Sequence, residues 1–109
     1  MTLHLPKPIE IYMSSENDRD TEALGACFSP NAPVKDEGRT MTGLKAIAAW
    51  RHETLLKYQH TTEPVAAFER DGKTVVTSKL SGNFPGSPVT LEFVFKLQGD
   101  KIVSLEIQS

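Results

Sequence analysis

The sequence predicts one α+β domain, in which three N-terminal helices pack on a curved antiparallel sheet. Apolar residues recur every three or four positions in the first half of the chain, as in helices, and alternate with polar residues in the second half, as in strands. Helices and strands that are segregated along a chain favour this class over alternating units around a parallel sheet. The length of 109 residues fits a single domain that spans residues 1–109.

Two short helices are predicted before residue 30. Proline is tolerated in the first turn of a helix, so the first helix is expected to begin at residues 6–8 and to reach Glu16. Tyr12 lies in the middle of its apolar face. Asp20 is a good N-cap for the second helix, which is expected to end before the Ser-Pro-Asn sequence at residues 29–31.

The third predicted helix is the longest and covers residues 44–58. With a turn of about 100° per residue, most of its apolar side chains form one narrow stripe. Arg51 falls inside this stripe, which is unexpected for a charged residue, and Trp50 and His52 flank it on opposite sides. The pattern therefore places a positive charge where the helix is expected to meet the core.

The clearest strand covers residues 89–97, whose odd positions are apolar and whose even positions are polar except for Val94. A return strand is expected at residues 102–107, after a turn. In this last strand the alternating apolar positions are Val103, Leu105 and Ile107. The two strands are therefore expected to present one apolar face to the helices.

Three further strands complete the predicted sheet. An Arg-Asp-Gly-Lys sequence at residues 70–73 is a hairpin turn signal between strands at residues 60–68 and 74–80. Residues 32–36 form a short strand that ends at Asp36. Residues 37–40 are expected to lead directly towards the third helix.

The composition argues against several classes of protein. The net charge of −2 arises from 12 basic and 14 acidic residues without a basic run, so no nucleic-acid partner is expected. No stretch approaches the roughly 20 apolar residues that span a bilayer, and residues 1–8 lack the apolar core of a signal peptide. We therefore expect a cytoplasmic protein without a membrane partner.

Cysteine and histidine give no indication of a metal site. Cys27 is the only cysteine, so neither an internal disulfide nor a thiolate cluster is expected, and the residue is predicted to be a buried small hydrophobe. His4, His52 and His60 do not have the spacing of metal ligands. No metal and no cofactor are expected.

Asp36 and Tyr12 are the candidate catalytic residues. A carboxylate and a phenol held on separate elements can act as the base and the oxyanion donor of a proton-transfer site. Each residue also has a structural interpretation. Asp36 can cap the turn at residues 37–38 or pair with Arg39, and Tyr12 can be a core tyrosine whose hydroxyl reaches solvent or a backbone carbonyl.

Other side chains are candidates for substrate binding in a pocket between helices and sheet. Arg51 can bind an anionic group, or its stem can lie on the core while its head reaches water or one of the acids Glu16, Asp36 and Glu37. Either His52 or His60 can be an acid/base partner. Aromatic residues at such positions are more often part of a core than of a ligand site. The expected substrate-binding residues are Trp50, Arg51, His60, Phe84, Leu91, Phe93 and Leu105.

The order of these features resembles the nuclear transport factor 2-like superfamily, and within it the SnoaL-like and ketosteroid-isomerase-like branch. The resemblance extends over nearly the whole chain and implies a cystatin-like cone, in which three helices cap a strongly curved sheet. The matching features are Tyr12, the Asn-Asp-Arg-Asp sequence at residues 17–20, the Cys-Phe pair at 27–28, the strand at 32–36, the helix start at 43–47, the Phe-Val-Phe sequence at 93–95 and the strand at 101–105.

The resemblance implies roles for individual residues. Asp36 falls where ketosteroid isomerases keep their general base, and Tyr12 falls where they keep the phenol that hydrogen-bonds the enolate. Leu91 falls where those isomerases place a second, protonated acid, so half of the usual oxyanion hole is missing. Glu92 has the opposite strand parity and is expected to point away from the pocket. SnoaL-like cyclases also use an acid, but no second acid is expected inside this pocket.

The resemblance implies a cofactor-independent enzyme that isomerises, cyclises or dehydrates a small apolar carbonyl compound by removing a proton next to the carbonyl. The alternatives are a non-catalytic protein that binds a small molecule in the same pocket, or a module for protein interaction. Members of the superfamily commonly form homodimers through the outer sheet face, so a homodimer is expected. That face is predicted to carry Thr90, Glu92, Val94, Lys96, Ser104, Glu106 and Gln108.

Overall fold

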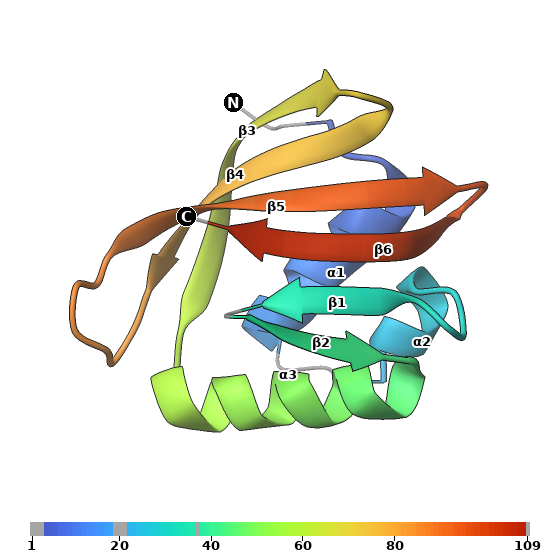
Figure 1. The fold of residues 1–109 in the computed structure, drawn as a ribbon. Coiled ribbons are helices and arrows are strands. Elements are labelled where there is room, and N and C mark those ends of the chain that lie inside the picture. The colour runs from blue at the N-terminus through green and yellow to red at the C-terminus, as the bar shows by residue number, and fades with distance from the viewer. Residues whose placement is uncertain (1–3, 19–21, 37, 109) are drawn as a thin grey trace.

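The computed structural model describes residues 4–18, 22–36 and 38–108 and confirms the predicted α+β arrangement. The helices and strands among these residues follow one another in a fixed order along the chain (Figure 1). They are α1 (Lys7–Asp18), α2 (Leu24–Cys27), β1 (Pro33–Asp36), β2 (Arg39–Thr42), α3 (Leu44–Tyr58), β3 (Thr61–Arg70), β4 (Lys73–Ser81), β5 (Val89–Gln98) and β6 (Lys101–Gln108).

The strands form one sheet in the order β2-β1-β6-β5-β4-β3. Four neighbouring pairs are antiparallel, whereas β1 and β6 are parallel. The helices cover one face of the curved sheet: α1 crosses behind β5 and β6, and α3 lies along β2 (Figure 1). Side chains from α1, α3 and the concave face of β4, β5 and β6 line a cavity.

Three local predictions differ from the structure. Residues 39–42 form the edge strand β2, although they were expected to lead directly to the third helix. The helix α2 has four residues, so the second predicted helix is too long, and its proposed cap, Asp20, lies outside the described residues. Helix α3, by contrast, has the predicted bounds, Leu44–Tyr58. Gly43 precedes it with φ of 92°, a conformation that residues with a Cβ rarely adopt.

A bulge changes which residues of β6 face the core. Lys96 pairs with Ser104 and Leu97 pairs with Ile102, so β6 contains one extra residue at this point. Ile102 is fully buried, whereas Val103 is only half-buried. The predicted alternation is therefore wrong at Val103, because the extra residue shifts the parity of the strand.

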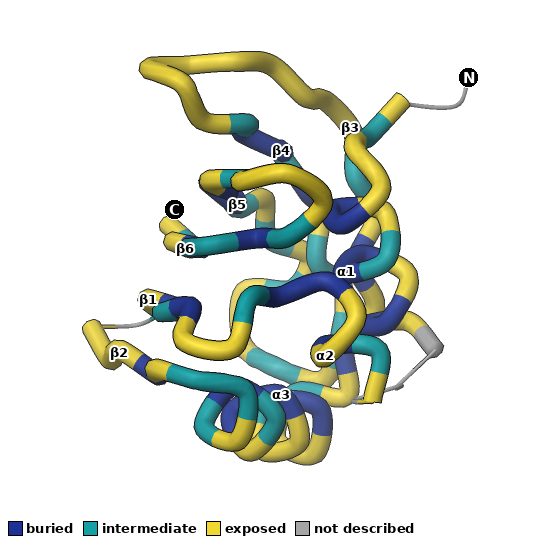
Figure 2. Tube along the Cα trace, turned by 90° about the vertical axis from the view of Figure 1, so that its right-hand side faces the viewer, coloured by how far each residue is buried: buried dark blue, intermediate teal, exposed yellow. Residues whose placement is uncertain are grey.

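Tyr12 lies in the centre of the core. Its ring contacts those of Phe28, Phe93 and Phe95, with centroid distances of 5.8, 6.2 and 5.5 Å. Cys27 is also buried, as predicted. Figure 2 shows that buried stretches of α1, β1, β5 and β6 face the interior, whereas β3 is exposed along most of its length. The core therefore joins α1 to the middle of the sheet.

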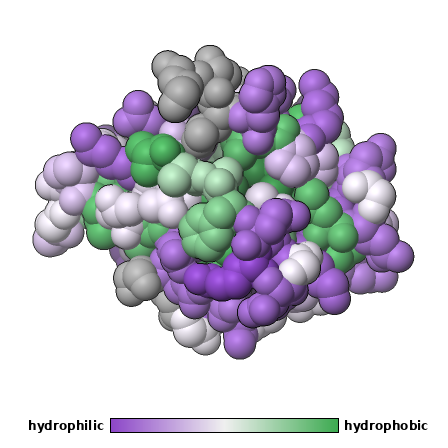
Figure 3. Space-filling view, turned by 90° about the horizontal axis from the view of Figure 1, so that it is seen from above, coloured by the Kyte–Doolittle hydropathy of each residue, from purple (hydrophilic) through white to green (hydrophobic). Residues whose placement is uncertain are grey.

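The outer surface combines hydrophilic residues with separate hydrophobic areas (Figure 3). The exposed large hydrophobic side chains of the described residues are Leu56, Val65 and Phe68. Among the described residues, no helix is long and apolar enough to cross a membrane.

Candidate functional site

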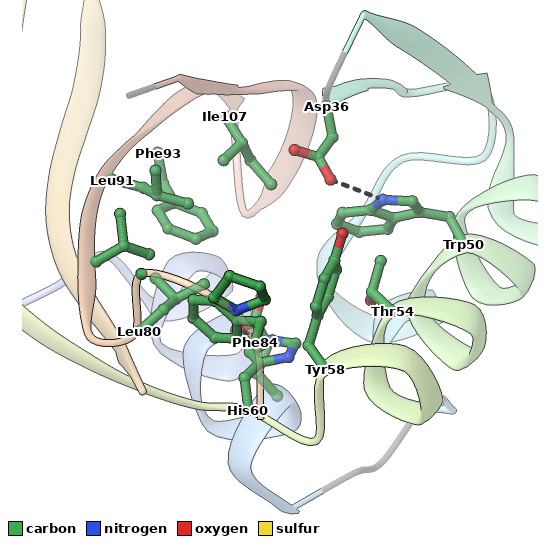
Figure 4. A pocket seen from close by; sticks show the side chains of 14 residues that line it. Asp36, Trp50, Thr54, Tyr58, His60, Leu80, Phe84, Leu91, Phe93 and Ile107 are labelled. Atoms are coloured by element: carbon green, nitrogen blue, oxygen red, sulfur yellow. Dashed lines mark hydrogen bonds and ion pairs between the residues drawn. The ribbon is translucent and has the colours of Figure 1, made fainter. Parts of the chain in front are cut away.

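A cavity of about 460 Å³ lies between α1, α3 and the concave face of the sheet. Most of its walls are apolar, and the rings of Trp50, Tyr58, Phe84 and Phe93 contribute to them (Figure 4). The lining residues are Glu16, Asp36, Trp50, Thr54, Tyr58, His60, Leu80, Phe84, Pro85, Gly86, Val89, Leu91, Phe93 and Ile107.

The cavity contains some of the predicted site residues and not others. The predicted residues that line it are Asp36, Trp50, His60, Phe84, Leu91 and Phe93. Tyr12, Arg51 and Leu105 are buried in the core and are not among the described residues that line it. The structure therefore separates the two candidate catalytic residues, because Asp36 lines the cavity and Tyr12 does not.

Asp36 is held at the cavity wall by Trp50. The indole Nε1 donates a hydrogen bond to Asp36 Oδ2 over 3.1 Å, and Figure 4 shows the carboxylate pointing from the end of β1 into the cavity. Trp50 is buried and Asp36 is half-buried. Arg39, the partner considered for Asp36 from the sequence, instead forms an exposed ion pair with Glu53 at 3.0 Å. Glu37, the first residue of the turn that Asp36 was considered to cap, lies outside the described residues.

A second carboxylate, Glu16, belongs to a buried group that we call the charged cluster: Glu16, Arg51, His60 and Thr62. Arg51 Nη2 lies 3.6 Å from Glu16 Oε1, and His60 Nε2 lies 3.5 Å from Glu16 Oε2. The hydroxyl of Thr62 donates a hydrogen bond to Glu16 Oε2. All four residues are at least 95% buried, so this carboxylate exchanges most of its hydration for contacts within the protein.

The partners of Glu16 together affect the pKa of its carboxyl more strongly than its burial does. Burial alone raises the pKa of the Glu16 carboxyl, but the hydrogen bond from His60, the charge of Arg51 and the hydrogen bond from Thr62 hold this pKa below its ordinary value. Glu16 is therefore a stable anion at neutral pH. It lines the cavity, so the expectation that no second acid lies inside the pocket is wrong.

Arg51 explains the charge in the apolar stripe of α3. Its exposed fraction is 1%, and its Nη1 donates a hydrogen bond to Ser15 Oγ over 2.9 Å. The guanidinium also lies over the ring of Tyr12, 4.7 Å from the centroid. Arg51 thus connects α3 to α1 through Glu16, as one of its sequence-based interpretations held.

The hydroxyl of Tyr12 is fully buried and has no hydrogen-bond partner among the described residues. Burial raises the pKa of this phenol well above its ordinary value, and the charge of Glu16 raises it further, while Arg51 opposes both effects. The phenol is therefore neutral over the physiological range.

His60 is held at the cavity floor by close backbone packing, whereas His52 is exposed. Gly82 lies against the segment from Tyr58 to His60: a Cβ at this position would lie 2.7 Å from the carbonyl oxygen of Tyr58 and 2.8 Å from the Cα of His60. Asn83 N also donates a hydrogen bond to the Tyr58 carbonyl over 2.8 Å. Only glycine fits this contact, which fixes the position of His60 relative to β4 and β5.

Comparison with known proteins places this geometry in a family. No protein-family model and no curated protein matches the chain. Among solved structures, a candidate polyketide cyclase from Sinorhizobium meliloti is 38% identical, with 95% of each chain covered and a TM-score of 0.91. The chain belongs to the nuclear transport factor 2-like superfamily.

Two more distant structures share the fold of this superfamily member. A protein with a ketosteroid isomerase-like fold from Catenulispora acidiphila, in complex with trimethylamine, is 18% identical, covers 97% of this chain and 87% of its own, and has a TM-score of 0.83. An isomerase-type protein of the SnoaL-like family from Agrobacterium tumefaciens is 17% identical, covers 92% of each chain and has a TM-score of 0.75. At these identities the likeness shows the fold alone.

The position of Leu91 in this superfamily member follows the predicted strand parity. Leu91 lines the cavity, while Glu92 lies near Arg70, with 3.5 Å between its Oε1 and Arg70 Nη2, and is not among the described lining residues. A leucine side chain thus occupies the place where the resemblance to ketosteroid isomerases implied an acid.

Glu16 lines the cavity but is not among the residues predicted to do so. A pattern in the sequence does indicate that Glu16 points inwards. Glu16 follows Tyr12 by four positions and so shares the apolar face of α1. An acid on one apolar helix face and an arginine on another indicate a buried ion pair. Tyr58 and Thr54 were also missed as lining residues, and they follow Trp50 on α3 at intervals of four.

Proposed function

We propose that the protein catalyses proton transfer next to the carbonyl of a small apolar substrate, with Asp36 as the general base. The observation that carries this proposal is a carboxylate that points into a mostly apolar cavity and is held there by the indole N–H of Trp50. A base fixed in place among apolar walls needs little reorganisation when the proton moves.

The reaction begins when an oxygen of Asp36 takes the proton from the carbon next to the carbonyl. The electron pair of the broken C–H bond forms a carbon–carbon double bond, and the carbonyl electron pair moves to the oxygen, which gives an enolate. Return of the proton to a different carbon isomerises the substrate. In cyclisation the enolate carbon attacks a second carbonyl, whose oxygen takes the proton from Asp36. In dehydration the enolate electron pair re-forms the carbonyl while the bond to the β-hydroxyl breaks, and this group takes the proton from Asp36 and leaves as water. None of these steps requires a cofactor.

The test compares the wild-type protein with Asp36→Asn. Proton exchange next to the carbonyl is measured by NMR in deuterated buffer with a panel of cyclic enones. We expect exchange in the wild type and a loss of about 10²–10⁴-fold in the variant, the range for removal of a general base. Asparagine keeps an oxygen that can accept the Trp50 hydrogen bond, so the fold is preserved. No exchange in the wild type, or equal exchange in both proteins, would overturn the proposal.

A second candidate function is binding of a small apolar molecule without chemistry, which the leucine at position 91 favours. A hydrophobic side chain there leaves the cavity with fewer donors for an enolate oxygen than an acid would. The protein from Catenulispora acidiphila, which shares only the fold, is bound to trimethylamine. If enones bind in NMR titrations without proton exchange, the binding function replaces the catalytic one.

We also propose that two copies pair through the outer sheet face. The exposed residues on this face include Lys96 and Glu106, which can form ion pairs across a two-fold axis. A hollow of about 230 Å³ on the face, lined in part by Lys35, Lys73 and Glu106, is large enough to receive side chains of a second copy. Sedimentation equilibrium measures the mass, and a monomer at millimolar concentration would refute the pairing.

A further inference from the structure

We propose that His60, oriented by Glu16, is a second proton-transfer group of the cavity and recognises an oxygen atom of the ligand. The inference deepens the proposed function and rests on it for the role of Asp36. It adds a binding site for a hydroxyl or carbonyl oxygen at the end of the cavity away from Asp36 (Figure 4). The expected ligand is therefore a cyclic apolar compound with one oxygen substituent.

The hydrogen bonding of His60 leaves one nitrogen for a ligand. Nε2 faces Glu16 Oε2 at 3.5 Å, while Nδ1 is buried and has no partner among the described residues. His60 itself is 5% exposed and lines the cavity. A buried polar atom without a partner is costly, and a polar atom of a ligand in the cavity would remove that cost.

Glu16 cannot easily turn away from His60, because the rest of the charged cluster holds it. Arg51 from α3 and the Thr62 hydroxyl from β3 both contact the same carboxylate. A carboxylate fixed beside Nε2 keeps a proton on that nitrogen and directs the acid/base chemistry to Nδ1. This is the arrangement of a base oriented by an acid.

The two ends of the cavity present different polar groups to a ligand. Glu16 and Arg51 carry opposite charges and compensate each other, and Asp36 on β1 is the remaining carboxylate among the described lining residues. The hydroxyl of Tyr58 lies near Trp50 and Asp36, whereas His60 lies at the other end (Figure 4). A ligand oxygen that gains negative charge at the end of the cavity away from Asp36 therefore lies next to His60.

The chemical step involves both ends of the cavity. Asp36 takes the proton from carbon, the C–H electron pair forms the double bond, and the carbonyl oxygen takes a proton from Nδ1 of protonated His60. The product is a neutral enol with a protonated Asp36 and a neutral His60. Return of the two protons, from Asp36 to a different carbon and from the enol oxygen to His60, restores the protein and completes an isomerisation.

The aromatic walls indicate the shape of the ligand. Rings of Trp50, Tyr58, Phe84 and Phe93 line the cavity, and Tyr58 and Phe84 meet edge to face with 5.6 Å between their centroids. Flat rings make favourable contacts with such walls. A bicyclic phenol such as 2-naphthol is therefore a suitable probe, because its hydroxyl imitates the enol, and naphthalene is its matched control.

The test uses long-range ¹H–¹⁵N NMR spectra of the histidine rings. His4 and His52 are exposed and serve as internal controls. We expect 2-naphthol to shift the Nδ1 resonance of His60 and naphthalene to leave it in place. We also expect 2-naphthol to bind about two- to tenfold more tightly than naphthalene, the gain from one hydrogen bond. Bound 2-naphthol without a shift at His60, or no binding at millimolar concentration, would overturn the inference.

A variant separates this inference from the proposed function. His60→Gln retains an N–H that can reach Glu16 but removes the imidazole Nδ1, so the preference for 2-naphthol should disappear. Asp36→Asn should retain the preference and lose enone exchange. If enone exchange is absent from the wild type but the preference depends on His60, the proposed function and the proton-transfer role of His60 fail, while its recognition of a ligand oxygen stands. If folded His60→Gln still binds 2-naphthol more tightly than naphthalene, His60 does not recognise the ligand oxygen and the inference is refuted.

Discussion

Glu16 and Asp36 both line one cavity, and the protein surrounds these two carboxylates in different ways. Glu16 is 3% exposed and meets Arg51, His60 and Thr62, whereas Asp36 is half-buried and accepts a hydrogen bond from Trp50. Glu16 stays charged, because protonation of its carboxylate would leave the guanidinium of Arg51 without a counter-charge. A carboxylate of this kind holds its neighbours in place. A carboxylate at a cavity wall can take a proton from a ligand. The cavity thus separates a structural anion from a candidate base.

The first and largest test of this comparison removes the cation beside Glu16. Arg51→Met leaves a buried carboxylate without its guanidinium, and we expect the free energy of unfolding to fall by about 3–5 kcal/mol. Arg39→Met is the matched control, because both members of its ion pair with Glu53 are more than half exposed, so the expected loss is below about 1 kcal/mol. Urea unfolding followed by Trp50 fluorescence measures both. Equal losses would show that burial does not distinguish the two pairs.

A second test uses the pH dependence of stability. The pKa of Glu16 is lowered in the folded protein, so its contribution is present above the ordinary pKa of 4.5 and is lost as the pH falls through the lower folded value. Unfolding free energies measured by urea between pH 7 and pH 3 should therefore fall less steeply for Glu16→Gln than for the wild type. The same slope in both proteins would contradict the view that Glu16 is held as an anion.

The smallest expected effect concerns Tyr12, whose role as enolate donor stays a prediction. Its hydroxyl has no partner among the described residues, so Tyr12→Phe should change the free energy of unfolding by less than about 1 kcal/mol at pH 7. The raised pKa of Tyr12 stabilises the fold below pH 10, and this contribution is lost as the pH rises further, so the variant should resist alkaline unfolding better.

Enone exchange then decides between the two interpretations of Tyr12. Unchanged exchange in Tyr12→Phe would identify a core tyrosine, while a loss comparable to that of Asp36→Asn would require the phenol to reach the substrate. Thermal unfolding of the same samples controls for damage to the core.

Several parts of the fold could be predicted because their causes are local. The bounds of α3 follow from a periodic stretch that starts after Gly43, and the turn at Asp71 and Gly72 follows from residues that accept positive φ, 53° and 76° here. The parity of Leu91 and Glu92 follows from strand alternation alone. By contrast, β2 lacks an apolar pattern and exists because it pairs with β1. Likewise, the bulge at Val103 depends on the register with β5.

The sequence by itself determined the α+β class, the third helix and the family resemblance, because helix and strand periods arise from neighbouring residues, and it indicated six of the fourteen residues that line the cavity. Only the tertiary structure decided which charges meet. Glu16 and Arg51 are 35 positions apart in sequence, and Glu16 and His60 are 44 apart, yet all three join in one cluster. It also decided that Asp36 faces the cavity and Tyr12 the core. Such pairings depend on how helices pack against the sheet, and no local pattern encodes that packing.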